Sequence, residues 1–179
     1  MSRFWQSFWE IIQTVIIAGV TVFLIRTYLI QPFLVSGASM DPYISHGNYL
    51  IVDQLTGRFQ EFQRSDIVVF RYPKDPDVFY IKRIIALPGD RVQIRNGSVF
   101  VNRERLDQSY LPEDSQTFGN VDLVLGKDEY YVLGDNRDNS SDSRAWGSLP
   151  RRYIMGLARL RLYPFDQIII IKRPAYENN

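Results

Sequence analysis

The chain has 179 residues, with 21 basic and 20 acidic side chains and a formal net charge of +1. This length is enough for one globular domain and a separable N-terminal segment, but not for two full-sized domains. The absence of cysteine excludes disulfides, zinc-thiolate sites and cysteine nucleophiles, and a single histidine leaves no histidine-cluster metal site. The balanced charge argues against nucleic acid as a partner, and we expect no metal and no cofactor.

Residues 4–25 are the most apolar part of the chain, and they contain no lysine or arginine. As a helix these 22 residues would be roughly 33 Å long, which matches the hydrocarbon core of a bilayer. Trp5 and Trp9 at one end and Tyr28 at the other are typical of interfacial anchors. A secretory signal would end in an A-x-A-like cleavage site, and none follows here. A helix that is apolar on every face would need a larger soluble protein around it, so the sequence predicts an uncleaved membrane anchor.

The anchor is expected to end at Gln31-Pro32, because the residue before proline is pushed toward extended geometry. The chain therefore divides into an N-terminal end with an anchor helix, residues 1–30, and a β domain, residues 31–179. Arg3 and Arg26 lie at opposite ends of the helix, so charge alone does not set its orientation in the membrane.

Beyond residue 32, short β-branched and aromatic runs alternate with turn signals, which predicts a mostly β domain built on an antiparallel sheet. The runs are YLIVD, DIVVFRY, VFYIKRIIAL, RVQIR, SVFVN, VDLVL, EYYVLGD and QIIIIK. An Asn-Gly pair within residues 91–102 predicts a tight hairpin. Two prolines in residues 71–78 predict a loop. Residues 102–120 could be an inserted region or subdomain, and the last five residues are expected to fray.

A candidate nucleophile lies in VSGASMDPYI, residues 35–44. Small residues such as Gly37 would let a substrate backbone come close to Ser39, and Pro42 would fix the turn that follows. The alternative is that Ser39 is an ordinary loop serine. His46 is expected to be structural or solvated, because the intervening Asp-Pro and Gly break any helix that would bring it to Ser39.

A candidate base lies in VFYIKRIIAL, residues 78–87. A strand places Tyr80, Lys82 and Ile84 on one face, between apolar neighbours. Desolvation there would lower the pKa of the lysine from about 10.4, and a neutral lysine can take a proton from serine. The alternative is a lysine at a strand edge whose amine reaches water.

The stretch GDNRDNSSDSRAWG, residues 134–147, combines Asp, Asn, Ser and Arg. A calcium loop of the EF-hand kind would need Gly at its sixth position and Glu at its twelfth, and neither is in register. Asp-Arg pairs and hydroxyls that support a neighbouring site explain this composition better.

Together these stretches resemble the bacterial type I signal peptidases, which are membrane-anchored Ser-Lys proteases. SGASM is similar to the family's serine box, SDIVVF to the strand that follows it, YIKRIIALPGD to the lysine box, and GDNRDNSSDSR to the last conserved box. The four segments occur in the family's order over residues 36–144, behind an N-terminal helix. Four such segments in order are far more specific than any one of them.

The resemblance implies that Ser39 is the nucleophile, that Lys82 is its general base, and that Ser140 hydrogen-bonds the lysine amine. It implies a supporting ion pair between Asp135 and Arg83, with Asp142 and Arg144 supporting the same region. The pocket residues it implies are Phe33, Val35, Gly37 and Ile81. It further implies a single-pass protein of the cell membrane with its site on the outer face, whose partners are signal-peptide-bearing preproteins, the lipid bilayer and the secretion machinery.

Two positions depart from the family pattern. Gly37 stands where some members have a Ser or Thr that donates to the oxyanion, so backbone donors such as the Ser39 N–H would have to serve. Ser65 stands where the family usually has Gly. The alternatives are a membrane-tethered β module that binds a partner without catalysis, an organelle inner-membrane processing peptidase, and a conjugation-system peptidase with one dedicated substrate.

Overall fold

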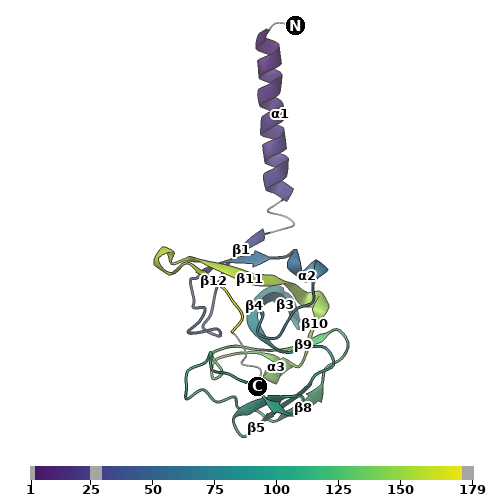
Figure 1. Ribbon diagram of the computed structural model, residues 1–179, viewed down its shortest axis with the longest axis vertical. Helices are drawn as coiled ribbons and strands as arrows, with labels where there is room; N and C mark the ends of the chain where they lie inside the picture. Colours follow the sequence, from purple (N-terminus) through teal and green to yellow (C-terminus); the bar gives the residue numbers. More distant parts are fainter. Residues whose placement is uncertain (1–2, 25–29, 175–179) are drawn as a thin grey trace.

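The computed structural model describes residues 3–24 and 30–174 (Figure 1). Helix α1, Arg3–Leu24, projects from the β domain and covers the predicted apolar run, residues 4–25, to within one residue. Its large apolar side chains between Trp5 and Phe23 are exposed, apart from the partly exposed Ile12, and this helix is long and apolar enough to cross a membrane. The expected end at Gln31-Pro32 was wrong, because both residues lie in a strand, β1, Ile30–Leu34. The sequence-based expectations for Tyr28, Arg26 and the last five residues lie outside the described part of the chain.

The larger of two sheets has eight strands, and every pairing in it is antiparallel. Its order is β1-β2-β11-β3-β4-β9-β10, and β12 pairs with β11. The strands are β1 Ile30–Leu34, β2 Tyr49–Asp53, β3 Ile67–Tyr72, β4 Asp75–Ala86, β9 Glu129–Leu133, β10 Leu149–Pro150, β11 Ile154–Tyr163 and β12 Ile169–Ile170. Short helical turns lie between strands: α2 Thr56–Phe59, α3 Ser143–Trp146, η2 Arg151–Tyr153 and η3 Phe165–Gln167.

The smaller sheet is inserted between β4 and β9, and its strands run in the order β7-β6-β5-β8. They are β5 Arg91–Arg95, β6 Ser98–Val101, β7 Glu104–Arg105 and β8 Val121–Val124. The predicted hairpin is confirmed, since Asn96 and Gly97 both have positive φ, 50° and 72°, as a type I′ turn requires. The predicted insertion at residues 102–120 contains β7 and an irregular stretch, while the predicted domain limits stay a prediction.

One expectation about the sheet was wrong, and one strand was missed. Residues 71–78 do not form an open loop: β3 and β4 form a hairpin, and the second proline, Pro76, lies within β4. Proline is tolerated there because the pairing jumps from Arg71↔Phe79 to Tyr72↔Asp75, which leaves Pro76 outside the ladder. The strand β11, central in the sheet, was missed altogether, because its three register shifts disrupt the alternation that marks a strand.

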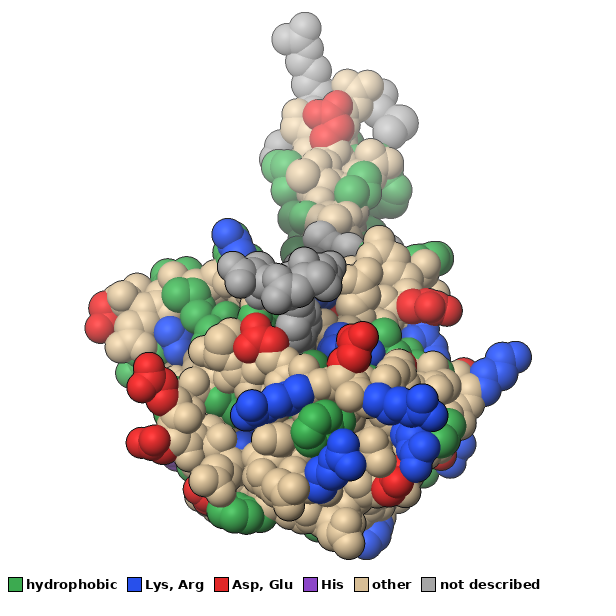
Figure 2. Space-filling view, turned by 60° about the horizontal axis from the view of Figure 1, so that its bottom comes forward, with side chains coloured by type: hydrophobic (Ala, Val, Ile, Leu, Met, Phe, Trp, Pro, Cys, Tyr) green, Lys and Arg blue, Asp and Glu red, His purple; other side chains and the backbone are tan. Residues whose placement is uncertain are grey.

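Side chains of β4 alternate between two parts of the core. Ile84 packs with Val68 and Val132 on one face of the large sheet, and Ile85 packs with residues of the small sheet on the other. Lys82 has the parity of Ile84, as the sequence predicted. Around this core, acidic and basic side chains are interspersed on the face seen in Figure 2, in keeping with the balanced charge.

Candidate active site

The loop that carries Ser39 follows β1 and is anchored in the core. Met40 and Ile44 are buried in a cluster with residues of β2 and β3. The Ile44 N–H donates to the Met40 carbonyl at 2.9 Å, which closes a turn after Ser39. Because its neighbour Met40 is fixed in the core, Ser39 is held at the surface of the sheet with a partly exposed side chain.

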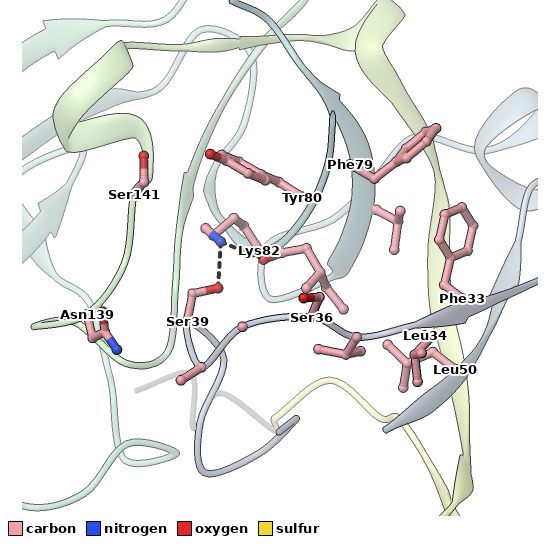
Figure 3. A pocket seen from close by; sticks show the side chains of 15 residues that line it. Phe33, Leu34, Ser36, Ser39, Leu50, Phe79, Tyr80, Lys82, Asn139 and Ser141 are labelled. Carbon is pink, nitrogen blue, oxygen red and sulfur yellow. Dashed lines mark hydrogen bonds between the residues drawn. The ribbon is translucent and has the colours of Figure 1, made fainter. Parts of the chain in front are cut away.

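Lys82 reaches Ser39 from the middle of β4. Its Nζ donates to Ser39 Oγ at 2.7 Å and to the Ile81 carbonyl at 2.9 Å (Figure 3). The Lys82 residue is 3% exposed, and its Nζ lies 5.0 Å from the centre of the Tyr80 ring. The edge-lysine alternative is therefore wrong: the amine is buried and contacts the candidate nucleophile.

Burial lowers the pKa of Lys82 from its ordinary value of 10.5 to about 8. The negative charges of Asp142 and Asp135 act in the opposite direction and would raise this pKa. Both carboxylates are paired with arginines, which moderates their effect on the amine. A fraction of the lysine is therefore neutral near pH 7 and able to accept a proton.

The residue after Lys82, Arg83, forms a buried bidentate ion pair with Asp135. Its Nε and Nη2 donate to the two carboxylate oxygens at 2.8 and 2.6 Å, and both side chains are 2% exposed. Burial alone would lower the pKa of Arg83, but Asp135 raises it overall, so the pair stays charged. Its guanidinium also lies over the ring of Tyr110, with 4.4 Å between Cζ and the ring centre.

Asp142 organises the next part of the loop. It accepts hydrogen bonds from Arg144 Nε at 2.8 Å and Arg144 Nη2 at 2.9 Å, and from the Gly134 N–H at 3.1 Å. Asp142 is fully buried and also begins the short helix α3. Asp142 and Arg144 were expected only to support this region, and the structure shows that they do so as an ion pair, which together with the Gly134 contact joins both ends of residues 134–144.

One expected contact is not formed. Ser140 was expected to hydrogen-bond the Lys82 amine, but its Oγ is buried without a hydrogen-bond partner among the residues that the structure describes. The amine instead uses the Ile81 carbonyl as its second acceptor. This carbonyl belongs to the residue that precedes Lys82 on β4.

A groove of about 310 Å³ runs past the Ser39–Lys82 pair. The four expected pocket residues, Phe33, Val35, Gly37 and Ile81, all line it. In Figure 3, the aromatic rings of Phe33 and Phe79 lie toward one end of this groove, and Asn139 and Ser141 lie beyond Ser39 at the other end. Those two rings contact each other edge to face, with centroids 5.6 Å apart. The groove is therefore apolar on one side of Ser39 and polar on the other.

The sequence matches the family described as "Signal peptidase, peptidase S26" over residues 8–163. The chain belongs to the signal peptidase family S26. A signal peptidase I P of Bacillus subtilis subsp. natto is 37% identical to it, over 88% of this chain and 90% of the relative. A signal peptidase I of Bacillus licheniformis is 36% identical over 91% and 92%. A solved signal peptidase I of Enterococcus faecalis is 27% identical, covers 55% of this chain and 97% of its own, and has a TM-score of 0.49.

Membership of the signal peptidase family makes this chain a serine peptidase, a hydrolase of peptide bonds whose task is the removal of signal peptides. The alternative of a binding module without catalysis is therefore wrong. With the apolar α1, this membership also indicates a membrane-anchored protein. In the described residues, no group of three or more His, Cys, Asp or Glu side chains could hold a metal ion.

Some residues of this signal peptidase site were missed from the sequence. Phe79 could have been found, because it has the strand parity of Ile81 and lines the same groove. Asn136, which hydrogen-bonds the Ser39 loop, lies in the segment GDNRDNSSDSR, but its residue type alone did not single it out, because asparagine is ordinary in a polar turn. His46 is structural, as expected: its Nδ1 accepts the Gly37 N–H at 3.3 Å.

A methyl group on Gly134 is expected to damage the site. A Cβ there would overlap the Ser39 carbonyl oxygen and Ser140 Oγ, and the overlap with backbone cannot be relieved by a rotamer change. Gly134→Ala should therefore destabilise the fold by about 1–3 kcal/mol, the usual cost of overpacking, and slow processing. Thermal unfolding and preprotein cleavage measure the two effects. Gly19→Ala in α1, which meets nothing within 4 Å, is the control, and equal behaviour of both variants would contradict the predicted close approach.

Proposed function

We propose that this peptidase removes the signal peptides of exported preproteins by cutting after small residues at positions −3 and −1, with a Ser-Lys dyad. Ser39 is the nucleophile and Lys82 is the general base. The observation that carries the proposal is the 2.7 Å contact between the buried Lys82 Nζ and Ser39 Oγ. A serine hydroxyl is a weak nucleophile unless an adjacent base takes its proton.

The reaction begins with neutral Lys82, which takes the Ser39 proton as Oγ attacks the carbonyl carbon of residue −1. The new C–O bond gives a tetrahedral intermediate with a negative oxygen. As this collapses, the C–N bond breaks, and the Lys82 ammonium gives its proton to the leaving amine. Water then attacks the acyl carbon while Lys82 takes a proton from it; the ester C–O bond to Ser39 breaks, the Lys82 ammonium returns its proton to Ser39 Oγ, and the signal peptide leaves with a new carboxyl group.

The negative oxygen needs a donor, and Gly37 offers no side-chain hydroxyl. Its N–H is also engaged, because it donates to His46 Nδ1. The Ser39 N–H makes no hydrogen bond among the described residues, and it is bonded to the residue that attacks. These contacts support the Ser39 N–H as a backbone donor to the oxyanion.

The substrate selectivity follows from the apolar part of the groove. Phe33, Val35 and Ile81 would contact the side chains at positions −1 and −3, and Gly37 lies where the substrate backbone passes. Small apolar side chains lose little on entering such a groove. A charged side chain would be desolvated without a partner, and a large one would not fit.

Features at one edge of the domain support a site at membrane level. The exposed side chains Leu34 and Tyr49 are paired across β1 and β2, and Tyr49 is paired in turn with the exposed Tyr163. This apolar edge begins in the strand that follows the anchor. The proposal therefore includes a single-pass protein with its β domain on the outer face of the membrane, where preproteins emerge from the secretion machinery.

A panel of preproteins tests this proposal. A substrate with Ala at −3 and −1 should be cut, and the same substrate with Trp or Lys at −1 should be cut at least about 100-fold more slowly, since a misfit or unpaired charge costs several kcal/mol. The measurement is the rate of mature protein formation by the full chain in membranes or detergent. Gly at −1 is the matched control, because it keeps the residue small.

Equal rates for Ala, Trp and Lys at −1 would contradict the groove assignment. A second arm with Ser39→Ala tests the catalytic assignment separately from the groove assignment. If all three substrates are cut at equal rates but cleavage still requires Ser39, the groove assignment fails and the Ser-Lys dyad stands.

A further inference from the structure

Asn136 makes two hydrogen bonds that cross between loops far apart in the chain, and a third within its own loop. Its N–H donates to the Ser39 carbonyl at 3.1 Å, and its Nδ2 donates to the Ala38 carbonyl at 3.1 Å. Its Oδ1 accepts the Asn139 N–H at 3.3 Å, which orients the amide so that Nδ2 faces Ala38. One residue therefore holds the carbonyl groups on both sides of the Ser39 Cα.

This double contact constrains the Ser39 side chain. The Ala38 and Ser39 carbonyls belong to the two peptide planes that meet at the Ser39 Cα, and peptide groups are planar. When both oxygens are held, both planes are held, and the direction of the Cα–Cβ bond follows from them. In a trans peptide the N–H points opposite to the carbonyl, so the bond from Asn136 to Ala38 also directs the Ser39 N–H away from Asn136.

The preceding residue fixes the other half of the dyad. Asp135 binds Arg83 through two hydrogen bonds, and Arg83 directly follows Lys82 on β4. The adjacent residues Asp135 and Asn136 thus contact both parts of the site. Asp135 binds the strand that carries the base, and Asn136 binds the loop that carries the nucleophile. We name this pair of residues the Asp135–Asn136 bridge.

We propose that Asn136 is a positioning residue of the peptidase, which through the Asp135–Asn136 bridge sets the distance and direction between Ser39 Oγ and Lys82 Nζ. It touches no reacting atom. This inference rests on the proposed Ser-Lys function. The amide of Asn136 would align the nucleophile in the way that other groups in an active site align the substrate. Such alignment matters because a small displacement of a nucleophile lowers the rate by a large factor.

Asn136→Ala in the full-length protein tests the proposal. It removes the side-chain bond to Ala38 and keeps the backbone bond to Ser39. We expect kcat to fall about 10- to 100-fold with KM within about twofold of wild type, since the groove residues are untouched. Asn120→Ala, at an exposed position outside the site, is the matched control and should behave as wild type.

The pH profile separates positioning from general loosening of the site. With Asn136→Ala, the pH at which the rate levels off should stay where it is, because no charge is added and Lys82 stays buried. A loosened site would admit water and move this pH upward. Asn136→Asp keeps the shape of the side chain but adds a carboxylate near the dyad. Its kcat should fall as much as that of Asn136→Ala, and the pH at which its rate levels off should also rise.

Three results would overturn the inference. The first is an unchanged kcat in Asn136→Ala, and the second is a loss of kcat/KM that comes entirely from a higher KM. The third is failure of both Asn136→Ala and Asn136→Asp to fold, which would show that Asn136 is needed for stability. Ser39→Ala in the same assay keeps the two levels apart. If Ser39→Ala still cleaves, the proposed function fails; if it is inactive while Asn136→Ala cleaves at the wild-type rate, only the positioning role fails.

Discussion

Replacing Ser39 with alanine is expected to abolish signal-peptide cleavage and leave the fold intact. The change removes Ser39 Oγ, the candidate nucleophile, which lies 2.7 Å from Lys82 Nζ. Loss of a nucleophilic serine costs at least about 10⁴-fold in kcat in other serine peptidases. The residue is only partly buried, and its Cβ and backbone remain, so the free energy of unfolding should change by less than about 1 kcal/mol.

The measurement is single-turnover cleavage of a preprotein by purified wild type and Ser39→Ala, with thermal unfolding of both. Ser98→Ala is the control, because Ser98 lies in the β5–β6 hairpin on the small sheet, away from the groove. Cleavage retained in purified Ser39→Ala would exclude Ser39 as the nucleophile. A large loss of stability would show that the variant fails for a structural reason.

The rate of cleavage is expected to rise with pH up to about 8 and then to level off. Only neutral Lys82 can accept the Ser39 proton, and burial lowers the pKa of this amine to about 8. Well below that pH, the neutral fraction and therefore the rate should grow about tenfold per pH unit. Lys82→Arg should be inactive at every pH, since guanidinium keeps its proton.

Lys82→Met is expected to be inactive and more stable than wild type at pH 7. Because the folded-state pKa lies below the ordinary value, the unfolded chain holds its proton more tightly, and the charged amine costs the folded state stability. This cost is full below pH 8 and disappears as the pH rises toward 10.5. The gain should be at most about 3 kcal/mol at pH 7, and it should shrink at pH 10.

Chemical or thermal unfolding at both pH values measures this gain, and Lys127→Met, at an exposed turn, is the control. A rate that is flat from pH 6 to 9, or processing by Lys82→Met, would contradict the role of Lys82 as base. The next candidate would then be His46, although its Nδ1 already accepts the Gly37 N–H.

Much of the fold could be predicted because the relevant signals are local. The hairpin at Asn96-Gly97 and the anchor helix depend on turn chemistry and on apolar length, which a sequence states directly. The strand β11 could not be predicted in the same way, because its bulges are set by its partners β2 and β3. The loop predicted from Pro76 was wrong for a related reason. Whether a strand tolerates proline depends on where the hydrogen-bond ladder is interrupted, which the sequence does not show.

The site shows the same division. The candidate nucleophile and base could be predicted from residue types and their segments, and the burial of Lys82 from its apolar neighbours. The position of Ser140 Oγ and the contacts of Asn136 could not, because they depend on how residues 134–144 pack against a loop almost a hundred residues earlier. A polar turn has many ways to satisfy its own groups, and only the folded surroundings select one.

The long chain separations within the site have a consequence for when the peptidase becomes active. Ser39 and Lys82 are 43 residues apart, and Asn136 lies 98 residues beyond Ala38. A fragment that ends before residues 134–144 lacks Asp135 and Asn136, whose hydrogen bonds reach Arg83 and the Ser39 loop, so we expect it to leave Ser39 and Lys82 unaligned. We therefore expect the peptidase to be inactive while its chain is incomplete, and its activity to begin only once residues 134–144 have packed against the Ser39 loop.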